Sequence, residues 1–279
     1  SIRNPAQTRD RLTTILMKKY FFLLLLLAFK TKAQELFAYT EPASNMPSKS
    51  VGIRLNNMLM KEESTNKTSY YLLPELMLAV NKNLMLHAET IFSNKDNAFA
   101  LHGASFYGKY RFLSNDQVHS HYRMAAYGRL SINNSTITQQ EIETNWLNSG
   151  FETGIIATKL INRLALSSSF SYEHAVDKDF KKLPPSQAAN ALNYTLSAGK
   201  LLLPKEYKNY KQTNLNMMVE FLGQALPGKG KSYMDIAPAV QFIFNSQARM
   251  DIGYRTALYN NVQRDAAHSF LLRFEYLFF

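Results

Sequence analysis

The segment VQFIFNSQARMDIGYR, residues 240–255, contains two runs of alternating apolar and polar side chains on either side of the turn-forming residues 245–247. In the second run Met250 and Ile252 alternate with charged residues such as Asp251. Successive side chains of a β-strand point to opposite faces, so a period of two is typical of strands and not of helices. The segment therefore predicts a β-hairpin with one apolar face and one charged face.

The same alternation continues along the chain from residue 48 onward. Twelve such segments are separated by stretches rich in turn-forming residues, which predicts an all-β chain of about 12 strands. The expected strands cover residues 48–60, 68–80, 84–93, 98–112, 119–131, 147–160, 164–174, 190–202, 213–224, 231–244, 248–259 and 267–279.

The connections between these segments alternate in length. Tight turns are expected at residues 81–83, 114–117, 161–163 and 245–247, and longer polar loops at 61–67, 132–145, 173–189, 223–231 and 259–266. Only the connection at 204–212 breaks the alternation. Short turns at one end and long loops at the other are typical of a transmembrane up-and-down antiparallel β-barrel. A soluble β-sandwich remains an alternative, because periodicity alone does not distinguish lipid from a packed core.

The composition favours a membrane barrel over a helical membrane protein. The chain has 16 Tyr and 18 Phe but one Trp, and no window after residue 29 approaches 18 uninterrupted apolar residues. Strands of a barrel expose only alternate side chains to lipid, so many aromatic residues are compatible with a polar average. The chain has no cysteine, which excludes a disulfide framework.

The first part of the chain has the pattern of an export signal. Lys18 and Lys19 precede an apolar run at residues 20–29, which is too short to span a bilayer as a helix. We expect a signal peptide at 17–33, cleaved before Gln34, with translation beginning at Met17 and residues 1–16 forming an upstream leader. An N-terminal membrane anchor is the alternative.

Beyond the signal, we expect an N-terminal periplasmic segment at residues 34–47, which can reach into the barrel, followed by the barrel itself at 48–279. Residues 1–33 hold seven of the 32 basic residues and one of the 21 acidic ones, so the remainder carries a net charge of only +5. That charge requires no nucleic-acid partner.

Eight basic and eight acidic side chains fall on the polar face of the expected strands and are therefore expected to line the lumen. They are Arg54, Lys109, Arg111, Arg123, Arg129, Arg249, Arg255 and Arg273, with Glu75, Glu89, Glu152, Glu173, Glu220, Asp235, Asp251 and Glu275. An ion in a narrow, low-dielectric lumen requires a partner, so a network of salt bridges is expected, either alone or along a conduction path. Balanced charge argues against strong ion selectivity.

Histidines and serines supply the candidate chemistry. His119 and His121 have an H-x-H spacing that can hold a metal between strand neighbours, although a plain position at the rim is the favoured interpretation. Ser171 and His174 are three residues apart and so point to opposite faces of a regular strand, as do His102 and Ser105 unless a bulge intervenes. We therefore expect no catalytic residues, no enzyme activity and no cofactor.

Three features resemble the predicted outer-membrane β-barrel proteins of Bacteroidota, a porin-like and transporter-like group. These are the leader KKYFFLLLLLAFKTKAQ at 18–34, the hairpin YLLPELMLAVNKNLMLHAET at 71–90 and the terminal FLLRFEYLFF at 270–279. The resemblance covers nearly the whole exported chain as a pattern of strands and turns. It implies a place in the outer membrane of a Gram-negative cell and transfers no site residues.

The favoured hypothesis is a porin-like channel or transporter for small solutes. The alternatives are a non-conducting structural or accessory barrel of an envelope complex and an outer-leaflet hydrolase. Expected partners are outer-membrane lipid, lipopolysaccharide near the lysines of loop 173–189, the barrel-insertion machinery and a small solute.

Overall fold

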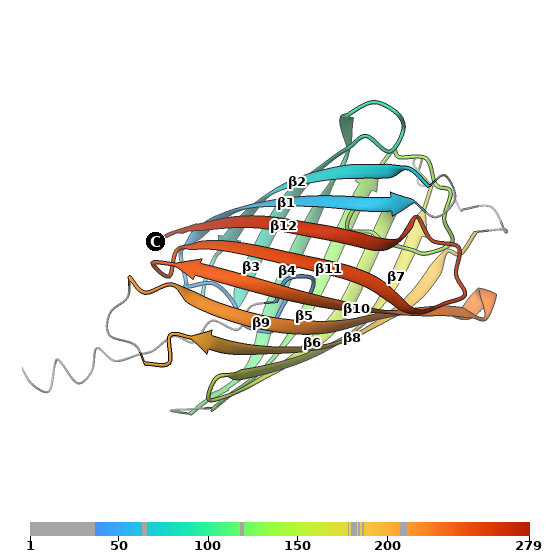
Figure 1. The fold of residues 1–279 in the computed structure, drawn as a ribbon. Coiled ribbons are helices and arrows are strands. Elements are labelled where there is room, and N and C mark those ends of the chain that lie inside the picture. The colour runs from blue at the N-terminus through green and yellow to red at the C-terminus, as the bar shows by residue number, and fades with distance from the viewer. Residues whose placement is uncertain are drawn as a thin grey trace, which may run out of the picture. The chain divides into compact units, whose positions relative to one another are not determined.

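The fold is a closed barrel of 12 antiparallel strands, seen in a computed structural model (Figure 1). The structure describes residues 37–62, 66–117, 120–177, 179, 183, 185, 187–206 and 211–279. The strands are β1 (Val51–Glu62), β2 (Thr68–Ala79), β3 (Leu84–Ser93), β4 (Ala100–Asp116), β5 (Ser120–Asn133), β6 (Ser149–Ile161), β7 (Leu164–Val176), β8 (Asn190–Leu203), β9 (Asn214–Leu226), β10 (Lys231–Phe244), β11 (Ala248–Asn260) and β12 (Ala266–Phe278).

Each strand pairs with its neighbours in sequence, and β1 closes the barrel against β12. This confirms the predicted up-and-down architecture and excludes the two-sheet sandwich. A short 3₁₀ turn, η1 (Pro227–Lys229), joins β9 and β10. Among the described residues, no helix is long and apolar enough to cross a membrane.

The register between strands follows from the alternation in the sequence. Arg54 on β1 lies opposite Glu275 on β12 and Glu75 on β2, whereas the next residue, Leu55, lies opposite Phe274. Residues directly opposite one another share a face, so the charged side chains collect inside and the apolar ones outside. A slip by one residue would place the charges in lipid.

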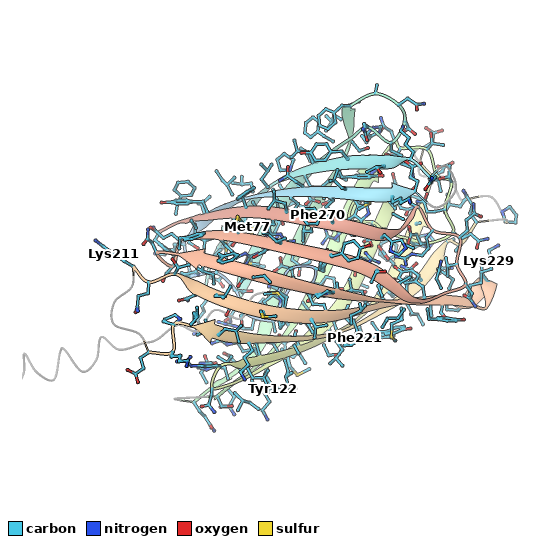
Figure 2. All side chains as sticks on the ribbon, viewed as in Figure 1. Met77, Tyr122, Lys211, Phe221, Lys229 and Phe270 are labelled. Carbon is cyan, nitrogen blue, oxygen red and sulfur yellow. The ribbon has the colours of Figure 1, made fainter. Side chains whose placement is uncertain are left out.

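The connections have two lengths, which define two ends of the barrel. The short-turn end includes the two residues between β6 and β7, where Asn162 has a positive φ of 55°. The long-loop end includes residues 134–148 and 261–265. Lys211 and Lys229 are labelled at opposite ends in Figure 2.

The turn predicted at residues 114–117 is wrong, because β4 continues to Asp116. There Asn115 pairs with Tyr122 and Asp116 with His121, and the Asp116 carboxylate lies 3.0 Å from Arg123. Polar, turn-forming residues can continue a hairpin beyond the membrane when their partners on the next strand pair with them.

The outer surface of the sheet is apolar. Leu130, Leu196 and Ile155 have exposed fractions of 64%, 56% and 51%, and Phe270 and Phe221 mark the outer face of β12 and β9 in Figure 2. Large apolar side chains exposed around a whole barrel require an apolar environment. The barrel therefore has the surface of an outer-membrane type of β-barrel.

We expect Ile155→Arg, at the middle of β6, to destabilise the barrel by about 2–4 kcal/mol, because it places a charge at the level of the lipid midplane. The matched change Ile132→Arg, near the long-loop end of β5, should cost only about 0–1 kcal/mol. Denaturant unfolding in lipid vesicles measures both. Equal costs at the two depths would contradict a lipid-facing surface.

Candidate functional site in the barrel lumen

The interior of the barrel contains most of the charged residues singled out by the sequence. Eleven of these side chains are buried: Arg54, Glu75, Glu89, Lys109, Glu173, Glu220, Asp235, Arg249, Asp251, Arg255 and Glu275. The other five, Arg111, Arg123, Arg129, Glu152 and Arg273, are partly exposed. Arg111 lies toward the short-turn end, where it donates to the carbonyl of Lys82 at 2.7 Å.

Near the short-turn end, Arg54 holds three carboxylates together. Its guanidinium lies 2.8 Å from Glu275, 3.1 Å from Glu75 and 2.7 Å from Glu41. Arg249 reaches the same Glu275 carboxylate at 3.1 Å. A buried guanidinium with several carboxylate partners is stabilised only while those partners remain, so this cluster ties β1, β2, β11 and β12 together.

Near the long-loop end, Arg264 likewise binds more than one carboxylate. It donates two hydrogen bonds to Asp235, at 2.7 and 2.8 Å, and one to Glu141 at 2.9 Å. Its guanidinium also lies 3.9 Å from the centre of the Tyr233 ring, a cation–π contact. Arg255 shares Asp235 at 2.5 Å. These contacts join the connections at 134–148 and 261–265 to the wall of β10 and β11.

The long connection at 134–148 packs against inward-facing side chains of the barrel wall. The backbone N–H of Ile142 donates to the Gln224 side chain at 2.9 Å, and Gln224 donates back to the Ile142 carbonyl at 2.6 Å. Thr144 donates its N–H and its hydroxyl to Glu173, at 2.6 and 2.7 Å. Ile142 and Leu147 are 1% and 3% exposed, so this loop occupies the long-loop end of the lumen.

The segment at residues 37–47, which precedes β1, lies inside the barrel. Successive N–H groups of Ala38, Tyr39 and Thr40 donate to the two carboxylate oxygens of Glu220, at 2.8, 2.9 and 2.9 Å. The Thr40 hydroxyl adds a fourth bond at 2.7 Å. Glu220 is on β9 and is fully buried, so water does not solvate its carboxylate. The segment therefore supplies most of its hydrogen bonds.

Side chains of β4 and β6 also bind the backbone of this segment. Lys109, fully buried on β4, donates to the carbonyls of Pro42 and Ser44 at 2.7 and 2.9 Å, and its ammonium lies 3.6 Å from the Glu41 carboxylate. Thr158 accepts the N–H of Ala43 at 2.9 Å. Contacts therefore reach the segment from β4, β6 and β9.

Between the charged clusters is an apolar core that the sequence reasoning missed. Phe37 packs with inward-facing Met58, Met60, Tyr71 and Leu73 of β1 and β2, all nearly inaccessible to solvent. These strands are apolar on both faces over part of their length, and this sequence feature could have predicted an apolar region inside the barrel. Glu41, Glu141 and Arg264 were also missed, because they lie outside the strands, where the sequence has no periodicity.

A small cavity lies at the long-loop end. It is lined by Met60, Glu143, Trp146, Arg255 and their neighbours and measures about 10 Å³, enough for one water molecule at most. Side chains of the wall and of the loop at 134–148 thus meet closely around it.

The histidines do not form a metal centre among the described residues, where no group of three or more metal-binding side chains occurs. His119 lies outside the described residues. His121 lies 3.1 Å from the Asp116 carboxylate, which also binds Arg123. His121 therefore lies beside the Asp116–Arg123 ion pair at the rim.

The serine and histidine pairs differ in their geometry. Ser171 is buried inside, whereas His174 packs against the outward ring of Phe151, so the two lie on opposite faces as predicted. His102 and Ser105, by contrast, are both buried, because a bulge in β4 leaves His102 without a partner on β3. His102 lies 3.2 Å from the carbonyl of Ser93.

No family model and no curated protein matches this sequence. Among solved structures, the chain is similar to an outer-membrane channel from Pseudomonas putida F1, with a TM-score of 0.53, 9% identity, and coverage of 87% of this chain and all of that one. It is also similar to the KdgM porin, with a TM-score of 0.45, 11% identity, and coverage of 82% and 99%. At these identities the likeness to the first shows a shared outer-membrane barrel fold.

We expect loop 134–148 to loosen as the pH rises. Burial raises the pKa of Glu143 to about 7 from its ordinary 4.5, with Glu152 and Glu141 adding to the effect and Arg255 and Arg129 opposing it. A carboxyl whose pKa is raised by folding stabilises the folded form at low pH, and this stability is lost as the pH rises toward and through about 7.

Trp146, in the same loop, is the only tryptophan, so its emission reports the loop directly. Its emission maximum should move to longer wavelength between pH 5 and pH 8 in the native protein. In Glu143→Gln, which keeps the side chain neutral, it should stay constant. An equal shift in both proteins would show that another group controls the loop.

Proposed function

We propose that this chain is a porin-like channel that passes small solutes across the outer membrane of a Gram-negative cell of the Bacteroidota type. The short-turn end then faces the periplasm and the long-loop end the exterior, in the usual orientation of outer-membrane barrels. Export by a signal peptide at 17–33, cleaved before Gln34, belongs to this proposal. So do contacts with lipopolysaccharide outside and with the barrel-insertion machinery through β12.

The observation that carries the proposal is the charged lumen inside a closed barrel with an apolar exterior. Acids and bases line its two ends, as in the clusters around Arg54 and Arg264. The fold is shared with a protein described as an outer-membrane channel. Because the lumen charges are nearly balanced, we expect weak selectivity between anions and cations.

In the conformation described, the segment at 37–47 and the loop at 134–148 occupy the lumen. Conduction therefore requires that at least one of them moves. The segment at 37–47 is the better candidate, because it joins β4, β6 and β9 through polar contacts with Lys109, Thr158 and Glu220, which water or a solute can replace.

The filled lumen favours a second candidate function, a non-conducting barrel that serves as the structural or accessory part of an envelope complex. In that case the internal segments complete the core and never leave it. An outer-leaflet hydrolase has no comparable support. Ser171 and His174 lie on opposite faces of β7, and His102 and Ser105, which are both buried, bond to the Ser93 carbonyl and to Glu89.

We expect conductance in planar bilayers to increase when the segment at 37–47 is displaced. In Gly253→Leu the new side chain takes the place of the Tyr39 ring, because a Cβ at this glycine would lie 2.8 Å from Tyr39 Cε2. Glu220→Ala removes the acceptor of four hydrogen bonds. Both variants should give single-channel steps several-fold larger or more frequent than those of the native protein.

The control is Glu206→Ala in the exposed turn after β8, which should conduct like the native protein. Folding of each variant is checked by its resistance to unfolding in detergent. If all of these folded proteins are electrically silent, the channel proposal fails and the accessory role is favoured.

A further inference from the structure

We propose that the lumen contains a binding site for peptides that carry a carboxylate, and that residues 37–46 occupy this site as an internal ligand. The inference rests on the proposed function, since it names acidic peptides as the solute class of the channel. Four features of the site lead to it.

The first feature is a carboxylate-binding pair of bases. The Glu41 carboxylate of the segment lies 2.7 Å from Arg54 on β1 and 3.6 Å from Lys109 on β4. Both bases are buried, with exposed fractions of 6% and 0%. A guanidinium and an ammonium converging on one anion in a buried site select a negatively charged group.

The second feature is the recognition of backbone N–H groups. Glu220 accepts hydrogen bonds from three successive residues, Ala38, Tyr39 and Thr40, and Thr158 accepts one from Ala43. Every peptide presents such N–H groups, so these contacts do not depend on side-chain identity.

The third feature is the recognition of backbone carbonyls. Lys109 donates to the carbonyls of Pro42 and Ser44, at 2.7 and 2.9 Å, from the strand that also reaches Glu41. The wall thus binds both the donors and the acceptors of one peptide backbone. Small inorganic ions do not present that combination of groups.

The fourth feature is space for an aromatic side chain. Gly253 on β11 lies beneath Tyr39, where a Cβ would come 2.8 Å from the Tyr39 ring. Glycine leaves room in the wall that a larger residue would fill. The Tyr39 ring of the segment fits this hollow.

Departure of the segment leaves Glu220 and Lys109 buried and short of partners. An ion that loses its partners in a buried site is strongly destabilised until water or another ligand replaces them. A peptide with an acidic residue supplies the same groups, so it exchanges with the segment at low cost. The segment therefore closes the lumen in the absence of solute and yields to a solute of its own chemistry.

The test uses the full chain and its lack of native cysteine. Ala43, which is fully buried, is changed to Cys, and the rate of maleimide labelling is measured in detergent or vesicles. The probe is the free peptide FAYTEPASNM, the sequence of residues 37–46, at increasing concentration. The matched control peptide carries Lys in place of the glutamate, E41K.

We expect the parent peptide to displace the segment and accelerate labelling of Ala43→Cys, and the E41K peptide to be weaker by on the order of tenfold or more. Lys211→Cys, in the exposed turn before β9, should react at one rate throughout. Should Ala43→Cys fail to fold, Ser44→Cys is the second reporter. Equal acceleration by both peptides, or none by either, overturns the proposal.

The outcome separates this inference from the proposed function. If Gly253→Leu conducts but the peptides do not affect labelling, the channel stands and the peptide site fails. If labelling responds to the acidic peptide while every variant is silent in bilayers, the binding site stands and the transport role fails.

Discussion

Charge pairing inside the lumen is the constraint on which the rest of this structure depends. Alternate positions of the strands carry acids and bases, and a closed barrel places them in a narrow interior where an unpaired ion is costly. Arg54 satisfies the constraint between neighbouring strands, because its partners Glu75 and Glu275 are its direct neighbours in the register. The register that closes the barrel is thus also the register that pairs the lumen charges.

Strand neighbours alone do not satisfy every charge. Glu220 and Lys109 find their main partners in the segment at 37–47, and Arg264 with Asp235 draws in Glu141 of the long loop. The internal segments enter the lumen because the wall presents charges that need them. The filled lumen is therefore a consequence of the charged interior, and any movement of these segments is coupled to a replacement of their partners.

The number of strands and the faces of Met250 and Asp251 could be predicted because alternation is a local property of the sequence. The positions of Glu41 and Arg264 could not, because residues outside the strands have no periodicity, and the bond between Arg264 and Glu141 joins residues 123 positions apart. The bulge at His102 and the extension of β4 depend on pairing with neighbouring strands, which single segments do not reveal.

The wall and its contents are held by different kinds of interaction, and this difference makes the lumen exchangeable. Backbone ladders hold the wall, and in lipid a broken ladder bond finds no substitute. Phe37 packs in the apolar core, and the rest of the segment at 37–47 is held by hydrogen bonds and ion pairs to side chains. Each of these polar contacts has a net worth of about 0.5–3 kcal/mol, because water or a solute can replace the partner. The same chain can therefore keep a rigid wall while its lumen alternates between its own segment and a ligand.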